Sequence, residues 1–433
     1  MTATEIVAVR GRRVWDSRGR PTVEAEVTLS GGARRRAIAP AGASVGSGEA
    51  VDLRDGGSRF GGADVMKAVG NVNGAIANTL RGRDARDQKS IDDTLIALDR
   101  TPDKARLGAN AMIATSMAVL HAAAAAADMP LYAYLLGDRP AAMPIPEVQI
   151  FGGGAHAGRR VDIQDFMVVA PKARSFAEAL DWTAEIYRAA GAMMRETGRL
   201  QGVADEGGFW PAFDSNTAAL DALMGAIERA GFTPGDEISI SLDVAASDFY
   251  RDGAYRLALD GRVLDSDAMS AMLIDWLDRY PIVSIEDPLA EHDAAGLTRF
   301  TKAVGHRVQI VGDDFLVTDA ARVRRAAAMP ACNAVLVKPN QVGTVSEAKA
   351  AVEAARAARW GAIVSARSGE TEDVTIVHLA VGWSVLQLKV GSFARSERMA
   401  KWNEALRIEE ALGSRTRFAG FEPWRGQVLA FRK

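Results

Sequence analysis

Charged and polar residues end six short apolar segments in the C-terminal two thirds of this 433-residue chain. Successive positions are 43, 27, 25, 29 and 22 residues apart, and most of these intervals fit one strand followed by one helix. In a β/α barrel the carboxyl ends of the strands converge on one mouth, where the active site lies. The pattern therefore predicts that these residues meet in space: Asp243, Glu286, Asp313, Lys338, Arg367 with Ser368, and Lys389.

Three of these residues are carboxylates and two are lysines. Carboxylates without histidine or cysteine form a hard oxygen ligand set that suits Mg²⁺. Lys338 and Lys389, on strands opposite the carboxylates, suggest one general base and one clamp for developing negative charge. A single carboxylate or lysine at a strand end is more often a helix cap or a solvent-exposed charge. Because the pattern recurs at every strand, we favour a catalytic site.

The remaining sequence predicts two units. Strands over 6–14, 22–30 and 36–39, followed by helices up to about Gly137, predict an N-terminal α+β lid domain of three strands and several helices. Pro140, Pro144 and Pro146 indicate a linker. Strands then alternate with helices, which predicts a parallel sheet and, with the strand-end residues, a C-terminal β/α (TIM-like) barrel. We expect domains at 1–137 and 138–433, the second containing the catalytic site.

Composition excludes several classes of protein. The net charge of −3 lacks the basic excess that a nucleic-acid surface needs. The single cysteine, Cys332, excludes a disulfide framework and a cysteine-rich metal site. The N-terminus has no signal-peptide pattern, and no long apolar stretch lacks a polar break, so we expect no membrane partner. We expect a soluble, cytoplasmic protein.

The chain resembles the enolases, the phosphopyruvate hydratases of glycolysis, from about residue 5 to about residue 411. The matching segments include Asp16-Ser17-Arg18-Gly19, Leu107-Gly108-Ala109-Asn110, Asp205-Glu206-Gly207-Gly208, Ser284-Ile285-Glu286-Asp287-Pro288, Arg367-Ser368-Gly369-Glu370-Thr371 and Leu406-Arg407-Ile408-Glu409-Glu410. So many specific strings in the same order make chance agreement negligible.

This resemblance implies two Mg²⁺ ions per active site. Asp243, Glu286 and Asp313 would bind the first ion, and Ser44, in a mobile lid loop, would help to bind the second together with substrate phosphate. Lys338 would remove the C2 proton of 2-phosphoglycerate, and surrounding cations would have to lower its pKa for that role. Both ions, together with the second lysine, Lys389, would stabilise the resulting enolate.

The resemblance also assigns the second half of the reaction. Glu206 would protonate the departing C3 hydroxyl, and Arg367 and Ser368 would hold the phosphate. His156 and Gln164 would belong to a second active-site loop near the leaving group or the phosphate. Enolases are dimers or octamers, so we expect a small phosphorylated anion as substrate and a homodimer or larger homo-oligomer.

Two departures fall inside this expected site. The family pattern Gln-Glu-Phe is Gln164-Asp165-Phe166 here, and the histidine of Ser-His-Arg-Ser is Ala366. The groups for proton abstraction are complete, whereas the leaving-group side is trimmed. One hypothesis is an ordinary enolase, and another is a paralogue of phosphonate-antibiotic biosynthesis similar to carboxyphosphonoenolpyruvate synthase. A non-catalytic binding protein on the same fold is disfavoured, because the charged residues would have no reason to survive together.

Overall fold

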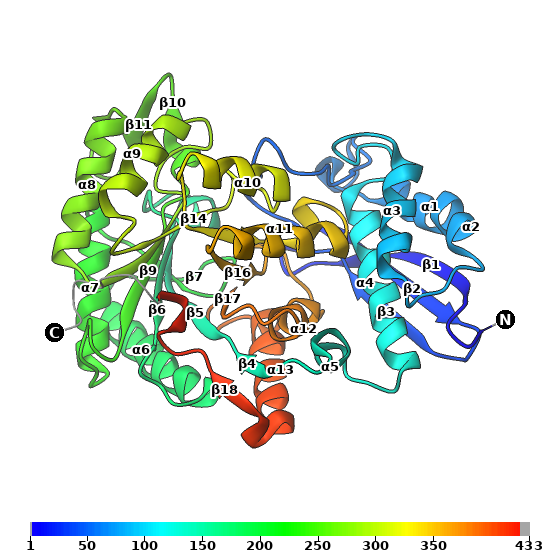
Figure 1. Ribbon diagram of the computed structural model, residues 1–433. Coiled ribbons are helices and arrows are strands. Elements are labelled where there is room, and N and C mark those ends of the chain that lie inside the picture. Colours follow the sequence, from blue (N-terminus) through cyan, green and yellow to red (C-terminus); the bar gives the residue numbers. More distant parts are fainter. Residues whose placement is uncertain (1, 425–433) are drawn as a thin grey trace.

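The computed structural model of the protein describes residues 2–424. Its N-terminal unit, at the right of Figure 1, is an antiparallel sheet in the order β1-β2-β3, covered by helices. The predicted strands and helices are confirmed, and Met66–Leu80 is one continuous helical stretch with π-helical hydrogen bonding at Val72–Ile76. The elements are β1 (Ile6–Trp15), β2 (Pro21–Leu29), β3 (Arg34–Ile38), α1 (Met66–Asn71), α2 (Ala77–Leu80), α3 (Gln88–Asp99), α4 (Ala109–Ala126) and α5 (Leu131–Leu136).

Helix α4 forms the centre of this unit. By length and composition it is the one helix among residues 2–424 that could cross a membrane, but 83% of it is buried inside the protein. It packs against β2 and β3, and its alanines allow a close approach on several sides. We therefore interpret α4 as a core helix.

The second unit is a closed barrel of eight strands, at the left of Figure 1. The sheet runs β17-β16-β15-β14-β13-β9-β6-β5, and pairing of β17 with β5 closes it. These strands are β5 (Ile145–Gly152), β6 (Asp165–Val169), β9 (Ser239–Asp243), β13 (Ile282–Glu286), β14 (Gln309–Gly312), β15 (Ala334–Val337), β16 (Gly361–Ser365) and β17 (Gln387–Gly391).

The prediction of a wholly parallel barrel sheet is wrong at β6, which is antiparallel to both β5 and β9. The segment between β5 and β6 holds only a short 3₁₀ turn, Gly154–Ala157. Because no helix carries the chain back to the other end of the barrel, the next strand must run in the opposite direction. The linker prediction also fails, since β4 (Ala141–Met143) pairs with β18 (Thr416–Phe418) and Pro146 lies within β5.

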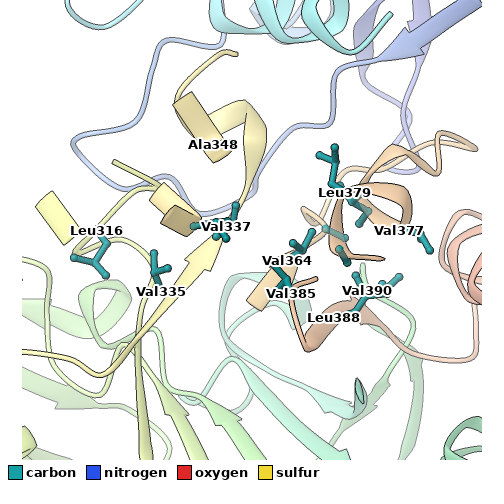
Figure 2. Packing of buried hydrophobic residues seen from close by; sticks show 14 of the residues in the cluster. Leu316, Val335, Val337, Ala348, Val364, Val377, Leu379, Val385, Leu388 and Val390 are labelled. Atoms are coloured by element: carbon teal, nitrogen blue, oxygen red, sulfur yellow. The ribbon is translucent and has the colours of Figure 1, made fainter. Parts of the chain in front are cut away.

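Helices surround the barrel and bury its outer face. They are α6 (Phe176–Glu196), α7 (Asn216–Arg229), α8 (Ser266–Arg279), α9 (Ala294–Val304), α10 (Ala320–Ala328), α11 (Val345–Ala357), α12 (Thr375–Gly382) and α13 (Ser396–Leu412). Figure 2 shows this packing, with Val337 of β15 and Val364 of β16 among the side chains of the core. Side-chain oxygens cap many of these helices; Thr344, for example, accepts from the backbone N–H of Glu347 in α11.

Inside the barrel, a layer of uncharged polar groups surrounds one carboxyl group. Glu147 of β5 accepts hydrogen bonds from Ser241 at 3.0 Å and from Gln387 at 2.7 Å. Gln387 also exchanges hydrogen bonds of 2.8 Å with Gln309. Burial raises the pKa of Glu147, while Lys389 acts to lower it. The barrel interior is therefore a packed polar core in which side chains satisfy one another.

The N-terminal unit caps a helix of the barrel. Ser116 of α4 accepts from the backbone N–H of Val345 at 3.0 Å, and Asp92 of α3 accepts from that of Ser346 at 2.9 Å. These N–H groups open α11 and have no partner within the helix. Burial raises the pKa of Asp92 to about 6, against the lowering effect of its hydrogen bonds. The two units therefore share one polar junction.

A buried histidine, His378, and the half-buried His121 beside it give the fold a pH dependence. His378 of α12 stacks on Tyr132 and meets His121 of α4 edge to face. Its Nε2 lies 3.4 Å from Glu404, and Asp373 also acts on it. Burial and the neighbouring His121 lower the pKa of His378 to about 4, although both carboxylates raise it. Because the unfolded chain binds the proton more readily, stability must fall as pH drops below about 6.5.

We expect His378→Phe to flatten this acid-side loss of stability. A histidine with pKa about 4 in the fold and about 6.5 when unfolded destabilises the protein by roughly 2 kcal/mol at pH 5 relative to neutral pH. Urea unfolding at pH 7 and pH 5 measures the difference. The matched control is the exposed His306, as His306→Gln. Equal pH dependence in His378→Phe and wild type would contradict the assignment.

Candidate active site

The strand-end residues converge at the mouth of the barrel. Lys389 on β17 points its Nζ between two carboxylates, donating to Asp243 Oδ2 at 2.7 Å and to Glu286 Oε2 at 2.8 Å. Asp243 ends β9 and Glu286 ends β13, and these adjacent strands hold the two residues in register. All three side chains are buried. Burial lowers the pKa of Lys389, but the carboxylates around it raise that pKa well above its usual range.

Lys338 pairs with the third carboxylate. Its Nζ donates to Asp313 Oδ2, while Gln341 donates to Asp313 Oδ1 at 2.9 Å. We expected neighbouring cations to lower the pKa of Lys338, and in this structure that expectation is wrong. Burial, Arg367 and Lys389 do act in that direction, but Asp313 and Glu286 outweigh them and raise the pKa.

The three predicted metal ligands are divided between the two lysines. Residues 2–424 contain two clusters of histidine and acidic residues that could hold a metal ion, with all ligand atoms within 4.8 Å of one another. They are His156–Asp165–Glu206 and Asp287–Asp313–Asp314. The trio of Asp243, Glu286 and Asp313 is not among these clusters, because each lysine draws its own carboxylates toward its ammonium group.

The acid side of the site contains an imidazole facing two carboxyl groups. His156 Nδ1 lies 3.6 Å from Asp165 Oδ1 and 3.9 Å from Glu206 Oε1. Burial lowers the pKa of His156, but the two carboxylates raise it overall. Burial raises the pKa of Glu206, whereas Lys389 and His156 outweigh burial at Asp165 and lower its pKa. Two carboxyl groups with opposite shifts are suited to different roles, with Glu206 the better proton donor.

Gln164 and the phosphate-side residues have protein partners. Gln164 donates to Asp243 Oδ2 at 2.9 Å. Arg367 makes a two-pronged ion pair with Glu49, at 2.8 and 3.1 Å, and also donates to the carbonyl of Ser44 at 3.2 Å. Ser368 accepts from Arg18 at 3.3 Å. The guanidinium predicted to hold phosphate is therefore engaged by a carboxylate of the lid loop.

The cavity among these residues measures only about 10 Å³, close to the size of one water molecule. Ala366, where the enolase pattern has histidine, lines it and is buried. Arg159 does not line it; its guanidinium donates to the carbonyl of Asp248 at 3.0 Å. The remaining lining residues are Gly42, Ala43, Ser44, His156, Gln164, Asp165, Glu206, Asp243, Lys338, Ser365, Arg367, Ser368 and Lys389.

Three residues that contact the site were not predicted from the sequence as part of it: Glu49, Arg18 and Gln149. Glu49 follows the glycine-rich segment of the lid loop, residues 41–48. Arg18 holds this segment by donating to the carbonyls of Ala41 and Gly42 at 3.1 and 3.0 Å. Gln149 of β5 donates to Asp165. The available signal for Gln149 was a polar residue two positions after Glu147, on the same face of the strand. The nearby glycines were the signal for Glu49.

The closed barrel carries carboxylates and lysines at its strand ends, and a loop from the N-terminal α+β unit covers them. These features define a barrel enzyme suited to acid–base chemistry. Residues 140–426 match the family model for the enolase C-terminal TIM barrel domain, and residues 6–135 match that for the enolase N-terminal domain. The chain belongs to the enolase family.

Individual relatives match over nearly the whole chain. It is 48% identical to Enolase 1 of Desulfitobacterium hafniense (strain Y51). That match extends over 421 residues and covers 96% of each protein. The chain is 48% identical to Enolase 2 of Pseudomonas syringae pv. syringae (strain B728a) and 47% identical to Enolase 2 of Pseudomonas syringae pv. tomato (strain ATCC BAA-871 / DC3000). Both matches cover 97% of this chain and 99% of the relative.

Removing the ammonium group of Lys389 should destabilise the protein, because two buried carboxylates would lose their main partner. We expect Lys389→Met to lower the free energy of unfolding by about 3–5 kcal/mol, measured by urea denaturation at neutral pH. The double variant Lys389→Met/Glu286→Gln should recover part of this loss, because one buried charge is removed. A Lys389→Met protein as stable as wild type would refute this view of the mouth.

Proposed function

We propose that this protein is an enolase-type lyase that converts 2-phosphoglycerate to phosphoenolpyruvate and water with Mg²⁺ as cofactor. The observation that carries the proposal is the convergence of Lys338, Lys389, Asp243 and the pair Asp165 and Glu206 on one small cavity. Glu286 and Asp313 lie directly behind it, each accepting a hydrogen bond from one of the two lysines. Family membership supports the same reaction class. A non-catalytic binding protein would have no use for buried charges arranged in this way.

The carboxylates Asp243, Glu286 and Asp313 fit a divalent cation. Oε1 of Glu286 is buried and has no hydrogen-bond partner among the described residues. Burial and repulsion from Asp243 raise the pKa of Glu286 well above its usual range, although Lys389 acts to lower it, so one ammonium group does not fully balance the two carboxylates that it joins. Oxygen ligands of this kind suit Mg²⁺. Such an ion would supply positive charge for the substrate carboxylate, and Ser44 of the lid loop would help to hold a second ion.

Lys338 would act as the base. In the reaction the C2–H bond breaks and Lys338 Nζ takes the proton, so the lysine must first be neutral. Asp313 and Glu286 oppose this neutral form, while burial, Arg367 and Lys389 favour it. Lys389 would remain charged, because its carboxylates hold its pKa high, and it would stabilise the enolate electrostatically.

Glu206 would complete the dehydration. The electron pair from C2 forms the C2=C3 double bond, the C3–O bond breaks, and Glu206 gives its proton to the departing hydroxide, which leaves as water. The raised pKa of Glu206 suits a donor, and ionised Asp165 with His156 would orient the leaving group.

Substrate binding would require rearrangement of the lid. A cavity of about 10 Å³ is far too small for a three-carbon phosphate. Arg367 and Ser368 would hold the phosphate, and the bidentate site on Arg367 that Glu49 fills has the geometry a phosphate needs. We therefore infer that phosphate replaces the Glu49 carboxylate and that the lid loop moves as it does so.

A second copy of the chain would bind at the sheet of the N-terminal unit. Trp15 and Phe60 are 50% and 42% exposed and meet edge to face. Arg13 lies over both rings. An exposed aromatic pair of this kind is typical of protein interfaces and supports a homo-oligomer.

The second candidate is a paralogue that forms a phosphonate analogue of phosphoenolpyruvate, similar to carboxyphosphonoenolpyruvate synthase. Asp165 and Ala366 favour it, because both line the cavity and both are shorter than the residues of the enolase pattern. A substrate of this paralogue would carry an extra anionic group, but Arg159 does not line the cavity and donates to the carbonyl of Asp248 instead, so it supplies no charge there.

A direct assay with 2-phosphoglycerate and Mg²⁺ separates the two candidates. An enolase should form phosphoenolpyruvate, followed by absorbance, at roughly 10 s⁻¹ or more. The paralogue should instead exchange the C2 proton in deuterated water, followed by NMR, about 10²-fold faster than it forms product. Lys338→Ala is the control and should lose both signals. Absence of exchange and product in the wild type would reject the proposed reaction on this substrate.

A further inference from the structure

Gln149 is a fully buried amide on β5 that joins two parts of the acid side. Its Nε2 donates to Oδ1 of Asp165, the first residue of β6, and its Oε1 accepts from the backbone N–H of Gly208 at 2.7 Å. The amide has one workable orientation. If it were reversed, its oxygen would face a carboxylate and its NH₂ group would face an N–H.

Gly208 belongs to the turn that carries Glu206. This turn connects β7 (Leu200–Val203) to β8 (Phe209–Pro211), and Ala204 N donates to the Gly208 carbonyl at 2.8 Å. On its other side, the carbonyl of Glu206 accepts from the backbone N–H of Ser392 at 2.8 Å. Gln149 therefore supports the turn with its side chain from the barrel interior, and Tyr187 of α6 supports it by donating to the carbonyl of Gly207 at 3.0 Å.

Two glycines make the space that Gln149 fills. A Cβ on Gly208 would lie 2.5 Å from Gln149 Oε1, and a Cβ on Gly152 would lie 3.2 Å from Gln149 Nε2 and 2.6 Å from the Cβ of Ala204. Neither glycine has a positive φ, so space rather than backbone conformation excludes a side chain at both positions. The amide is consequently enclosed and cannot move far from its two partners.

We propose that Gln149 is a positioning residue that fixes the Asp165 carboxylate relative to the Glu206 turn. Both carboxyl groups face the same atom, His156 Nδ1, at 3.6 and 3.9 Å. Gln149 binds the Asp165 carboxylate directly, and it holds Glu206 indirectly by accepting from Gly208 in the turn that carries Glu206. This inference rests on the proposed function, in which these groups expel the C3 hydroxyl, and it adds a residue that touches neither substrate nor proton.

The length of Gln149 is matched to the short side chain of Asp165. Because the space around the amide is closed by Gly152 and Gly208, a residue longer by one methylene at position 165 would press against it. Asp165→Glu alone should therefore impair the acid side. Gln149→Asn in the same chain removes one methylene and should restore the fit.

The test compares Gln149→Met, which keeps the length but loses both hydrogen bonds, with wild type. We expect phosphoenolpyruvate formation to fall roughly 10- to 100-fold, as for other groups that orient a reacting residue, while C2 proton exchange changes less than about twofold. Gln309→Met is the matched control, because Gln309 is an equally buried amide inside the barrel that contacts Ser284 and Gln387 instead. It should leave the ratio of the two rates unchanged.

The length-matched pair supplies the rescue. Asp165→Glu and Gln149→Asn should each slow product formation, and the double variant should recover at least about tenfold over the slower single variant. A Gln149→Met protein that loses exchange and product formation in equal proportion, or loses neither, would overturn the positioning role. Failure of the double variant to exceed either single variant would overturn the length match.

A readout without substrate separates this inference from the proposed function. Gln149→Met should raise amide hydrogen exchange at Gly208 at least about tenfold, whereas Gln309→Met should not. If wild type neither exchanges nor dehydrates 2-phosphoglycerate, the proposed function fails. The Gly208 amide then decides the inference: faster exchange supports the hold on the turn, and an unchanged rate overturns it.

Discussion

Charge compensation in the barrel mouth is the constraint on which the rest of the structure depends. Asp243, Glu286 and Asp313 are buried together with Lys338 and Lys389. A buried charge without a partner costs several kcal/mol, so each ammonium group must lie within reach of a carboxylate. The same compensation affects the protonation of Lys338, because Asp313 and Glu286 outweigh burial and raise its pKa.

The loop after β16 is held from two sides so that this cluster can face a substrate. From the barrel side, Arg398 of α13 donates to the carbonyls of Arg367 and Ser368 at 2.7 and 2.6 Å. From the N-terminal unit, Arg18 donates to Ser368, and Glu49 pairs with Arg367. The loop of Arg367 and Ser368 is therefore held by both units, whereas the carboxylates Asp243, Glu286 and Asp313 and both lysines come from the barrel alone.

The charged part of the site could be predicted from spacing, because the carboxyl ends of barrel strands must converge. Asp243, Glu286 and Lys389 lie together as that rule requires. The antiparallel β6 could not be predicted in this way, since the reversal depends on the length of one loop. The pairing of Arg367 with Glu49 also escaped prediction, because it joins residues 318 positions apart through the fold.

The side of the site around Asp165 shows a second limit of sequence reasoning. Asp165 alone suggests a retracted carboxylate, but the structure shows that Gln149 reaches it from the neighbouring strand. A side chain and its support can change together, and their packing is visible only in three dimensions.

The most direct test of the charge-compensation account is calorimetric titration of the protein with Mg²⁺ at neutral pH. The account predicts binding in the wild type that Asp243→Asn, Glu286→Gln and Asp313→Asn each weaken at least about tenfold, because every variant removes one hard anionic ligand. Asp236→Asn, at an exposed carboxylate that pairs with Lys172 on the surface, should leave the affinity unchanged. Wild-type affinity in all three mouth variants would contradict the account.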